Sequence, residues 1–364
     1  MRYPSRLRGH LVAAAAFAVA LSAGLAQAAQ TANQPFAGVT HIFREDQSPR
    51  PVRMHVLLID LKAPGIRFML TPRSGPRHTV KQTTLEFLTA QKAQIAINAH
   101  YFEPWPPPSP DDGAAELVGL AASNGDVYSP FNANPPKAYA IRANAPALNI
   151  DADNRAAIVH RSAADSTGRT VAEPVRLFTA LAGNEQILTD GKVTAGEGKW
   201  DNTPNPLTVI GLARAGKLVI LIVDGRQKGT SEGLSTREAA GFLARDYGVT
   251  DAINLDGGGS TTLCMADPTP RVVNVPVGLD NKPGTLRPVG SNLAIFAAAT
   301  PATQPATTTG PASGGGFGVG RLAERNSDGR WALPLTIAAV VVLAILVYLS
   351  VSRRKGGKGE DQSP

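Results

Sequence analysis

Between residues 50 and 300 the hydrophobic positions fall mainly into short runs bounded by glycine, proline and other turn residues. Runs of this length and composition are typical of β-strands. Strands are expected at 56–60, 67–71, 94–98, 117–122, 126–129, 208–213, 218–223 and 252–255. Pro64-Gly65 predicts that the first two are paired, and Asn124-Gly125 and Ala215-Gly216 predict hairpins. Leu85 and Leu88 give 84–92 the spacing of a helix.

The segment 218–255 has the clearest order of elements. The run 218–223 is apolar without interruption, as expected for a strand buried on both faces. Ser235 and Glu238 form a capping box that starts a helix, and Gly248 ends it. A second apolar strand follows, so the order predicts a strand-helix-strand crossover with parallel strands. The expected fold class is α+β, a domain built on a mixed β-sheet.

The two ends of the chain have the patterns of exported membrane proteins. Residues 1–28 combine an arginine-rich start, a short apolar run and an Ala-x-Ala site, which predicts a signal peptide. Residues 333–351 carry no charge and are long enough for a C-terminal transmembrane helix. Basic residues follow it, so 352–364 is expected to be a cytoplasmic tail. The predicted location is the cell membrane, single-pass, with the domain on the extracytoplasmic side.

Two further ranges complete the predicted organisation. Residues 299–330 are rich in Pro, Thr, Ala and Gly and are expected to be a linker, which leaves 36–298 for the folded domain. Of the formal net charge of +7, three units come from the first 28 residues and two from the last 13, so +2 remains for 29–351. A nearly neutral domain gives no electrostatic reason to expect nucleic acid as a partner. Cys264 is the only cysteine, which excludes an intramolecular disulfide.

Residues suited to chemistry follow the two apolar strands of the crossover. Asp224 and Asp256 each come directly after a strand, and parallel strands would bring both carboxylates to one edge of the sheet. The glycine run that follows Asp256 can direct backbone N–H groups at an anion. Arg226, Ser231, Gly258, Ser260 and Thr261 add a cation, hydroxyl groups and amides to the two carboxylates. Such a set suits a substrate that contains both a sugar and a phosphate.

Each of these residues also has a structural interpretation. Asp-Gly is a common turn dipeptide, and three glycines can mark a bulge. The run lacks the lysine of a phosphate-binding P-loop, and no G-x-S-x-G elbow surrounds Ser260. The six histidines show no metal-ligand spacing, so no metal site and no cofactor are evident. A hydrolase of another class, with Ser260 as nucleophile, remains an alternative, although no histidine is recognisably placed as its base.

Four strings of the sequence resemble the motifs of the phosphodiester glycosidase family. They are INAHYF (97–102), VDGRQKGTSEGLSTREAAGFL (223–243), INLDGGGSTTL (253–263) and VNVPVG…LRPVGSNLAIF (273–296). The family includes an enzyme that removes N-acetylglucosamine from a phosphodiester, and bacterial proteins associated with exopolysaccharide. By this resemblance the residues expected to line the active site are Asn98, Asp224, Arg226, Ser231, Asp256, Gly258, Ser260, Thr261 and Arg287.

The resemblance implies a hydrolase that cleaves a sugar-1-phosphodiester in a glycan or glycoconjugate. Asp256 is expected to be the leading catalytic carboxylate and Asp224 its partner, since the transition state of glycosyl transfer has oxocarbenium character. Arg226, Arg287, the glycine amides and Ser260 would hold the phosphate. The family usually has an Arg-Thr pair where this chain has Leu207-Thr208, and the loss of an arginine weakens anion binding. A non-catalytic binder of anionic cell-surface polysaccharide is therefore the alternative.

Overall fold

The computed structural model describes residues 29–300, apart from 107–111 and 215. The predicted signal peptide, apolar segment 333–351 and tail 352–364 lie outside these residues, as does the linker except for 299 and 300. Within the described residues, no helix has both the length and the apolar character needed to cross a membrane. The first described strand, β1, spans Ala29–Phe36.

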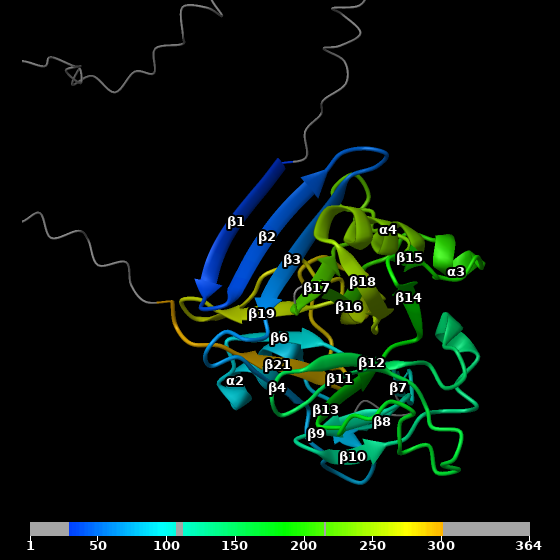
Figure 1. The fold of residues 1–364 in the computed structure, drawn as a ribbon. Helices are drawn as coiled ribbons and strands as arrows, with labels where there is room; N and C mark the ends of the chain where they lie inside the picture. Colours follow the sequence, from blue (N-terminus) through cyan, green and yellow to red (C-terminus); the bar gives the residue numbers. More distant parts are fainter. Residues whose placement is uncertain (1–28, 107–111, 215, 301–364) are drawn as a thin grey trace, which may run out of the picture. The chain divides into compact units, whose positions relative to one another are not determined.

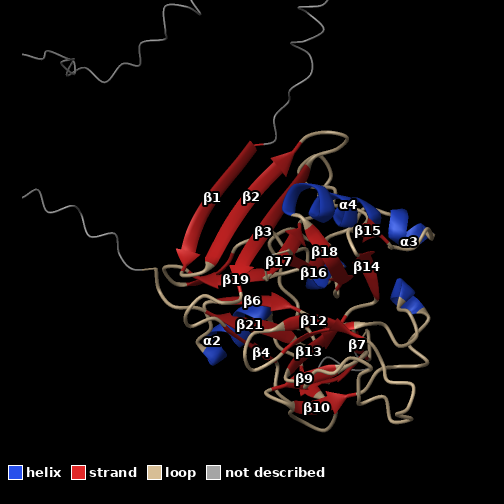
Figure 2. Ribbon diagram, in the orientation of Figure 1, coloured by secondary structure: helices blue, strands red, loops and turns tan. Residues whose placement is uncertain are grey.

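The described chain is built mainly from four antiparallel sheets, and few helices accompany them (Figures 1 and 2). The largest sheet has the order β1 (Ala29–Phe36), β2 (Val39–Asp46), β3 (Val52–Asp60), β17 (Lys217–Val223), β16 (Leu207–Ala213), β18 (Val249–Asn254), β14 (Glu185–Thr189), β15 (Lys192–Val193). A second has the order β20 (Pro270–Val272), β19 (Leu263–Ala266), β6 (Ile95–Asn98), β21 (Asn292–Phe296), β4 (Arg67–Leu70).

The other two sheets lie in the lower half of the molecule as drawn in Figure 1. One has the order β10 (Asp126–Ser129), β9 (Ala121–Ser123), β13 (Thr179–Ala182), β11 (Ala147–Ile150), β12 (Ala156–Val159), and the other the order β5 (Thr79–Val80), β8 (Ala114–Leu117), β7 (Phe102–Glu103). The described helices are α2 (Thr84–Gln91), α3 (Lys199–Asn202) and α4 (Thr236–Tyr247), with 3-10 turns η1 (Ala138–Ala140) and η2 (Gly258–Ser260).

The predicted α+β class with a mixed sheet is wrong, because strands dominate and every pairing between the named strands is antiparallel. The helix between β17 and β18 does exist, with Ser235 as its N-cap and Gly248 in the left-handed conformation at its end. However, β16 lies between the two strands and is antiparallel to both. The strands thus run in the same direction but are not neighbours.

Burial on both faces explains why β17 reads as a strand of a parallel sheet. Leu218, Ile220 and Ile222 pack into the core between the sheets, whereas alternate residues such as Leu221 pack into a second core beneath α4. An antiparallel strand that is covered on both faces needs the same unbroken apolar run as a parallel one. The apolar run therefore reports two-sided burial and does not reveal strand direction.

The local predictions mostly agree with the structure. The hairpins β9–β10 and β16–β17 and the helix α2 form at the expected residues. The pairing across Pro64-Gly65 does not form, because β3 pairs with β2 and β17 while β4 pairs with β21 in another sheet.

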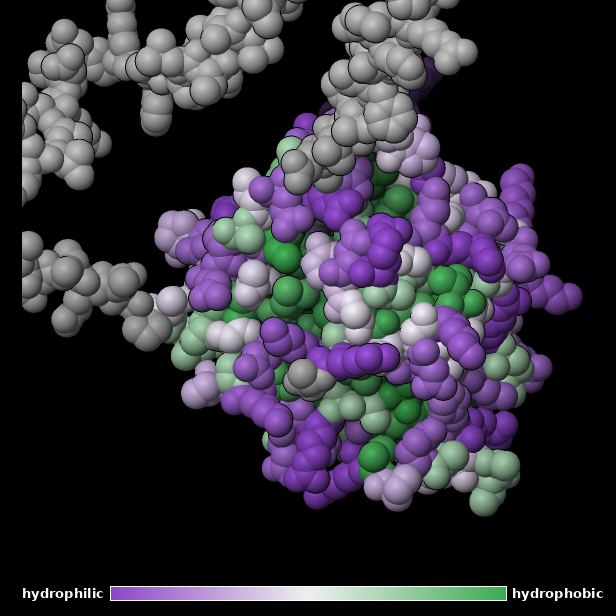
Figure 3. Space-filling view, turned by 45° about the horizontal axis from the view of Figure 1, so that its top comes forward, coloured by the Kyte–Doolittle hydropathy of each residue, from purple (hydrophilic) through white to green (hydrophobic). Residues whose placement is uncertain are grey.

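On the face shown in Figure 3 polar side chains predominate, and apolar ones appear in patches between them.

The core beneath α4 provides a test of this packing. Leu221 is fully buried there, so Leu221→Ala should lower the free energy of unfolding by about 2–5 kcal/mol, through lost burial and the cavity that remains. Val193→Ala, at a position 38% exposed on the edge strand β15, serves as the control. Denaturant unfolding of residues 29–300 measures both. Equal effects of the two variants would contradict the two-sided burial.

Candidate active site

The candidate site lies where β18 ends and the glycine run begins. Asp256 follows this strand, and the residue is only 7% exposed. The Ser260 hydroxyl donates a hydrogen bond of 2.5 Å to Asp256 Oδ2, and Arg287 Nη2 lies 3.8 Å from the same oxygen. Burial raises the pKa of the Asp256 carboxyl, whereas Arg287 and the hydrogen bond from Ser260 oppose that rise. The carboxylate is thus buried but paired with a cation.

The glycines of the turn are required by close contacts. A Cβ atom on Gly259 would lie 1.8 Å from the carbonyl oxygen of Gly278, and one on Gly257 would lie 2.8 Å from that of Pro206. Gly258 has a φ of +60°, in the left-handed region that glycine adopts without strain. Because these glycines have no side chain, the backbone between Asp256 and Ser260 can pass directly beneath the neighbouring loops.

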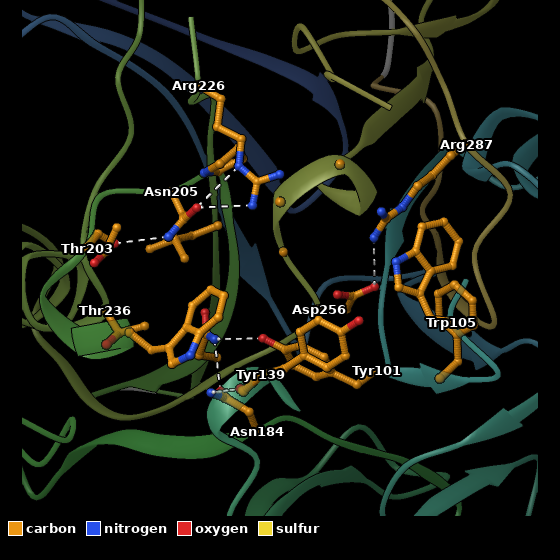
Figure 4. A pocket seen from close by; sticks show the side chains of 18 of the residues that line it. Tyr101, Trp105, Tyr139, Asn184, Thr203, Asn205, Arg226, Thr236, Asp256 and Arg287 are labelled. Carbon is orange, nitrogen blue, oxygen red and sulfur yellow. Dashed lines mark hydrogen bonds and ion pairs between the residues drawn. The ribbon is translucent and has the colours of Figure 1, made fainter. Parts of the chain in front are cut away.

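Two arginines stand on either side of this turn (Figure 4). Arg226 donates hydrogen bonds to Asn205 Oδ1 from Nε (3.3 Å) and Nη2 (3.1 Å), and to Asn281 Oδ1 from Nη1 (2.9 Å). Arg287 donates to the Ser260 hydroxyl, and its guanidinium lies 4.3 Å from the centre of the Trp105 ring. Burial and the charge of Arg287 lower the pKa of Arg226. Two fixed cations that repel each other form a site for an anion.

The opposite side of the site consists of neutral groups. Tyr101 and Tyr139 lie together there, with ring centres 5.9 Å apart. Asn254 Nδ2 donates to Asn184 Oδ1 at 2.9 Å and to the Tyr101 hydroxyl at 3.4 Å, while Asn254 Oδ1 has no hydrogen-bond partner among the described residues. Amide and phenol groups of this kind can bind sugar hydroxyls. Burial and the charge of Asp256 raise the pKa of Tyr101, which keeps its phenol protonated.

These groups enclose a pocket of about 280 Å³. Four of the predicted site residues line it, namely Arg226, Asp256, Gly258 and Arg287. Leu207, where the resemblance led us to expect an arginine, also lines it. The lining residues that the sequence analysis missed include Tyr101, Trp105, Tyr139, Asn184, Trp200, Asp201, Asn205 and Asn254. Tyr101 and Asn254 lie inside the quoted motifs and could have been found there, whereas the others are isolated in the sequence.

Asp224 does not line this pocket. Its carboxylate accepts hydrogen bonds from Asn274 Nδ2 (2.9 Å) and from the backbone N–H of Val275 (3.0 and 3.2 Å). Burial raises the pKa of the Asp224 carboxyl, and these bonds oppose the rise. The Ser231 hydroxyl donates to the carbonyl oxygen of Asp224 at 2.6 Å and accepts from the backbone of Arg53 at 2.9 Å. Asp224 and Ser231 therefore hold loops together near the site.

The remaining predicted residues lie behind the pocket. Asn98 Nδ2 donates to the carbonyl oxygen of Asp256 at 2.5 Å, and its Oδ1 accepts from the Thr208 hydroxyl and the N–H of Thr262. Asn98 thus positions the backbone that carries Asp256. The carbonyl of Thr261 accepts a hydrogen bond from Asn274. Ser260 contacts the site through its bonds to Asp256 and Arg287, and among the described residues no histidine contacts its hydroxyl.

His100, which lies within the motif INAHYF (97–102), has a structural role. It is fully buried, with Nδ1 3.0 Å from the Ser291 hydroxyl and Nε2 within reach of Leu120 O (3.0 Å) and Ala182 N (3.1 Å). Burial lowers the pKa of His100 to about 4. Among the described residues, no group of three or more His, Cys, Asp or Glu side chains is arranged so that it could hold a metal ion.

The comparison with known families gives the class of this protein, a hydrolase acting on phosphodiester-linked sugars. The family model for phosphodiester glycosidases matches residues 91–296, more than half of the chain, and the chain belongs to this family. The resemblance read from its motifs is therefore confirmed.

Solved structures share the fold of this chain. One is the catalytic domain of zebrafish N-acetylglucosamine-1-phosphodiester alpha-N-acetylglucosaminidase, auto-inhibited by its pro-peptide. It is 19% identical, with a TM-score of 0.52, and the match covers 76% of this chain and 90% of that one. Another is a putative exported protein from Burkholderia pseudomallei, 14% identical, with a TM-score of 0.51 and coverage of 75% and 97%. No curated protein sequence matches the chain.

The contacts of Asp224 predict that its charge supports the fold and not the chemistry. In Asp224→Asn a side-chain amide can face the N–H donors of Asn274 and Val275, which would leave buried donors unpaired. We expect the free energy of unfolding to fall by about 1–3 kcal/mol, with turnover per folded molecule close to that of the wild type. Denaturant unfolding and active-site-normalised kinetics measure the two effects. Loss of turnover in Asp224→Asn with an unchanged free energy of unfolding would contradict this prediction and indicate that Asp224 acts in catalysis.

Proposed function

We propose that the domain hydrolyses a sugar-1-phosphodiester in a glycan or glycoconjugate. The observation that carries this proposal is the position of Asp256, at the junction between a cationic and a neutral half of one pocket. Arg226 and Arg287 border one half, and Tyr101, Tyr139 and the amides of Asn184 and Asn254 border the other. A substrate with an anionic group bonded directly to a sugar fits that division.

In the proposed reaction the phosphate lies between the two guanidinium groups and the glycine turn. The bond between the anomeric carbon and the phosphate oxygen breaks, and water supplies the new anomeric hydroxyl. The arginines hold the negative charge that grows on the departing phosphate, so this leaving group needs little help from a general acid. The Asp256 carboxylate, next to the anomeric carbon, stabilises the positive charge that develops on the sugar ring. Tyr101 and Asn254 orient the sugar through its hydroxyls.

Leu207 is the observation that favours the alternative, a domain that binds an anionic polysaccharide without cleaving it. It lines the pocket at the position where the resemblance led us to expect a third cation. Two guanidinium groups nevertheless remain, and each is fixed by hydrogen bonds to neighbouring side chains. Two fixed cations and a buried carboxylate are sufficient for the proposed reaction, so hydrolysis is the function that the geometry supports best.

Replacement of Asp256 separates catalysis from binding. Asp256→Asn is nearly isosteric and keeps an acceptor for the Ser260 hydroxyl, but it removes the negative charge. We expect turnover of a responsive sugar-1-phosphodiester to fall about a hundredfold or more, with little change in melting temperature. Asp251→Asn, on the same strand β18, is the matched control and should retain turnover. Full activity of Asp256→Asn would remove Asp256 from the mechanism, and binding without turnover by the wild type would support the alternative.

We further propose that the domain is exported and held at the extracytoplasmic side of the cell membrane. The support is the sequence of the two ends, the signal-peptide pattern of 1–28 and the apolar segment 333–351 followed by basic residues.

Reporter fusions test this location. A reporter that is active only outside the cytoplasm should be active when it is fused after Gly315, and a reporter that is active only inside the cytoplasm should be active when it is fused after Pro364. The two positions should lie on opposite sides because a single apolar segment separates them. Fusion of a periplasmic-type and a cytoplasmic-type reporter at each site provides the internal control. The same side for both positions would contradict the proposed location.

A further inference from the structure

Two buried acids and one half-exposed arginine form a group that has no role in the reaction described above, and one of the acids, Asp201, lines the pocket. Glu185 and Asp201 are 4% and 3% exposed. The guanidinium of Arg142 approaches both carboxylates, with Nε 3.3 Å from Glu185 Oε2 and Nη2 3.9 Å from Asp201 Oδ2. Two ionised carboxylates beside one guanidinium would leave a net negative charge buried among protein atoms, an arrangement that burial strongly disfavours.

A hydrogen-bond donor is missing from this group. Glu185 Oε1 is buried without a hydrogen-bond partner in the described structure. Asn254, the cross-strand neighbour of Glu185 on β18, likewise has an unpaired buried Oδ1. Two carboxylates can bond to each other only when one of them keeps a proton, so a shared proton would supply the missing donor and balance the charge of Arg142.

Each member of the group is joined to a different wall of the pocket. Glu185 follows the lining residue Asn184 on the chain. Arg142 comes three residues after Tyr139, and its backbone N–H donates to the carbonyl oxygen of Asn184 at 2.8 Å. The group therefore fixes the position of the pocket wall that contains Tyr139 relative to the wall that contains Asn184.

Asp201 fixes the third wall, formed by α3. Its Oδ2 accepts a hydrogen bond from the N–H of Gly198 at 3.0 Å, which caps the short helix. Its carbonyl oxygen accepts from the Thr236 hydroxyl at 3.3 Å, which ties the helix to α4. The neighbouring residue Trp200 lines the pocket and is 56% exposed. Helix α3 thus holds this exposed indole at the mouth of the pocket.

We propose that Glu185 and Asp201 share one proton beside Arg142, and that this proton holds three walls of the pocket in place. Glu185 is then a positioning residue for hydrolysis, acting through α3 and the Asn184 wall and not on the substrate itself. The positioning role rests on the proposed function, whereas the shared proton does not.

The electrostatics of Glu185 agree with this arrangement. Burial and the proximity of Asp201 raise the pKa of Glu185 to about 7, and Arg142 opposes the rise. The charge of Glu185 also contributes to the raised pKa of Tyr101, whose phenol stays protonated. Above about pH 7 the pair loses its shared proton, and the two carboxylates repel each other. Activity should therefore decline as the pH rises through about 7.

Two substitutions at Glu185 test the positioning role. In Glu185→Gln the amide supplies a permanent donor to Asp201, so the alkaline decline in kcat/KM should move upward by at least about one pH unit, with each profile normalised to its own maximum. Glu185→Leu removes the donor, so kcat/KM should fall about tenfold to a hundredfold below that of Glu185→Gln. Glu45→Gln, whose side chain pairs with Arg53 on the far strands β2 and β3, is the control and should keep the wild-type profile. An unchanged alkaline decline in Glu185→Gln would overturn the role.

The pH dependence of unfolding tests the shared proton without any substrate. Because the pKa of folded Glu185 lies above its ordinary value of 4.5, folded protein retains a proton that the unfolded chain releases between about pH 4.5 and 7. Stability contributed by Glu185 therefore falls as the pH rises through that window. The melting temperature of Glu185→Gln relative to the wild type should rise by at least about 4 °C between pH 5 and pH 8, whereas the difference for Glu45→Gln should stay constant. If the difference in melting temperature between Glu185→Gln and the wild type is the same at pH 5 and pH 8, the shared proton is contradicted. This result does not depend on whether the protein turns over a phosphodiester.

Discussion

The burial of the Asp256 carboxylate is the constraint on which the rest of the site depends. A lone carboxylate in so closed a position would be strongly destabilising, so the surrounding structure has to compensate its charge. Ser260 and Arg287 do so directly, and Arg287 in turn lies against the Trp105 ring. The compensation is incomplete, because the pKa of Asp256 stays raised. A positive charge developing beside this carboxylate would complete it, which is the condition for stabilising a glycosyl transition state.

The same constraint explains the glycine turn and the asparagine behind it. For Ser260 to reach back to the carboxylate, the chain has to reverse within a few residues beneath the carbonyls of Pro206 and Gly278, where a Cβ atom would collide with them. Asn98 then fixes the start of the turn through the carbonyl of Asp256. Within the motif, the glycines avoid close contacts around the turn and Ser260 compensates the charge of Asp256. A motif of this kind can identify a family even when overall identity is low.

Local signals in the sequence predicted the elements well, and the arrangement of those elements poorly. The capping box at Ser235, the left-handed Gly248 and the turn at Asn124-Gly125 act over a few residues, so the sequence contains their whole cause. Strand order depends on which distant strands bury which faces, and β16 separates β17 from β18 for reasons that lie outside that segment. The same distinction between local signals and tertiary arrangement applies to the residues of the site. Asp256 and Gly258 were found within a motif, whereas Asn184, Trp200 and Asn205 enter the pocket only through tertiary structure.

Asp224 shows how a correct inference about direction can still misplace a side chain. Strands β17 and β18 do run the same way, so both aspartates emerge at one edge of the sheet, yet Asn274 and Val275 bind the Asp224 carboxylate outside the pocket. A phosphate leaving group removes the need for that second carboxylate as an acid, because its charge is already stabilised in solution and by two arginines. In the proposed reaction Asp256 is the one directly acting carboxylate. In the proposed arrangement the acids Glu185 and Asp201, the second of which lines the pocket, keep their shared proton for a structural role.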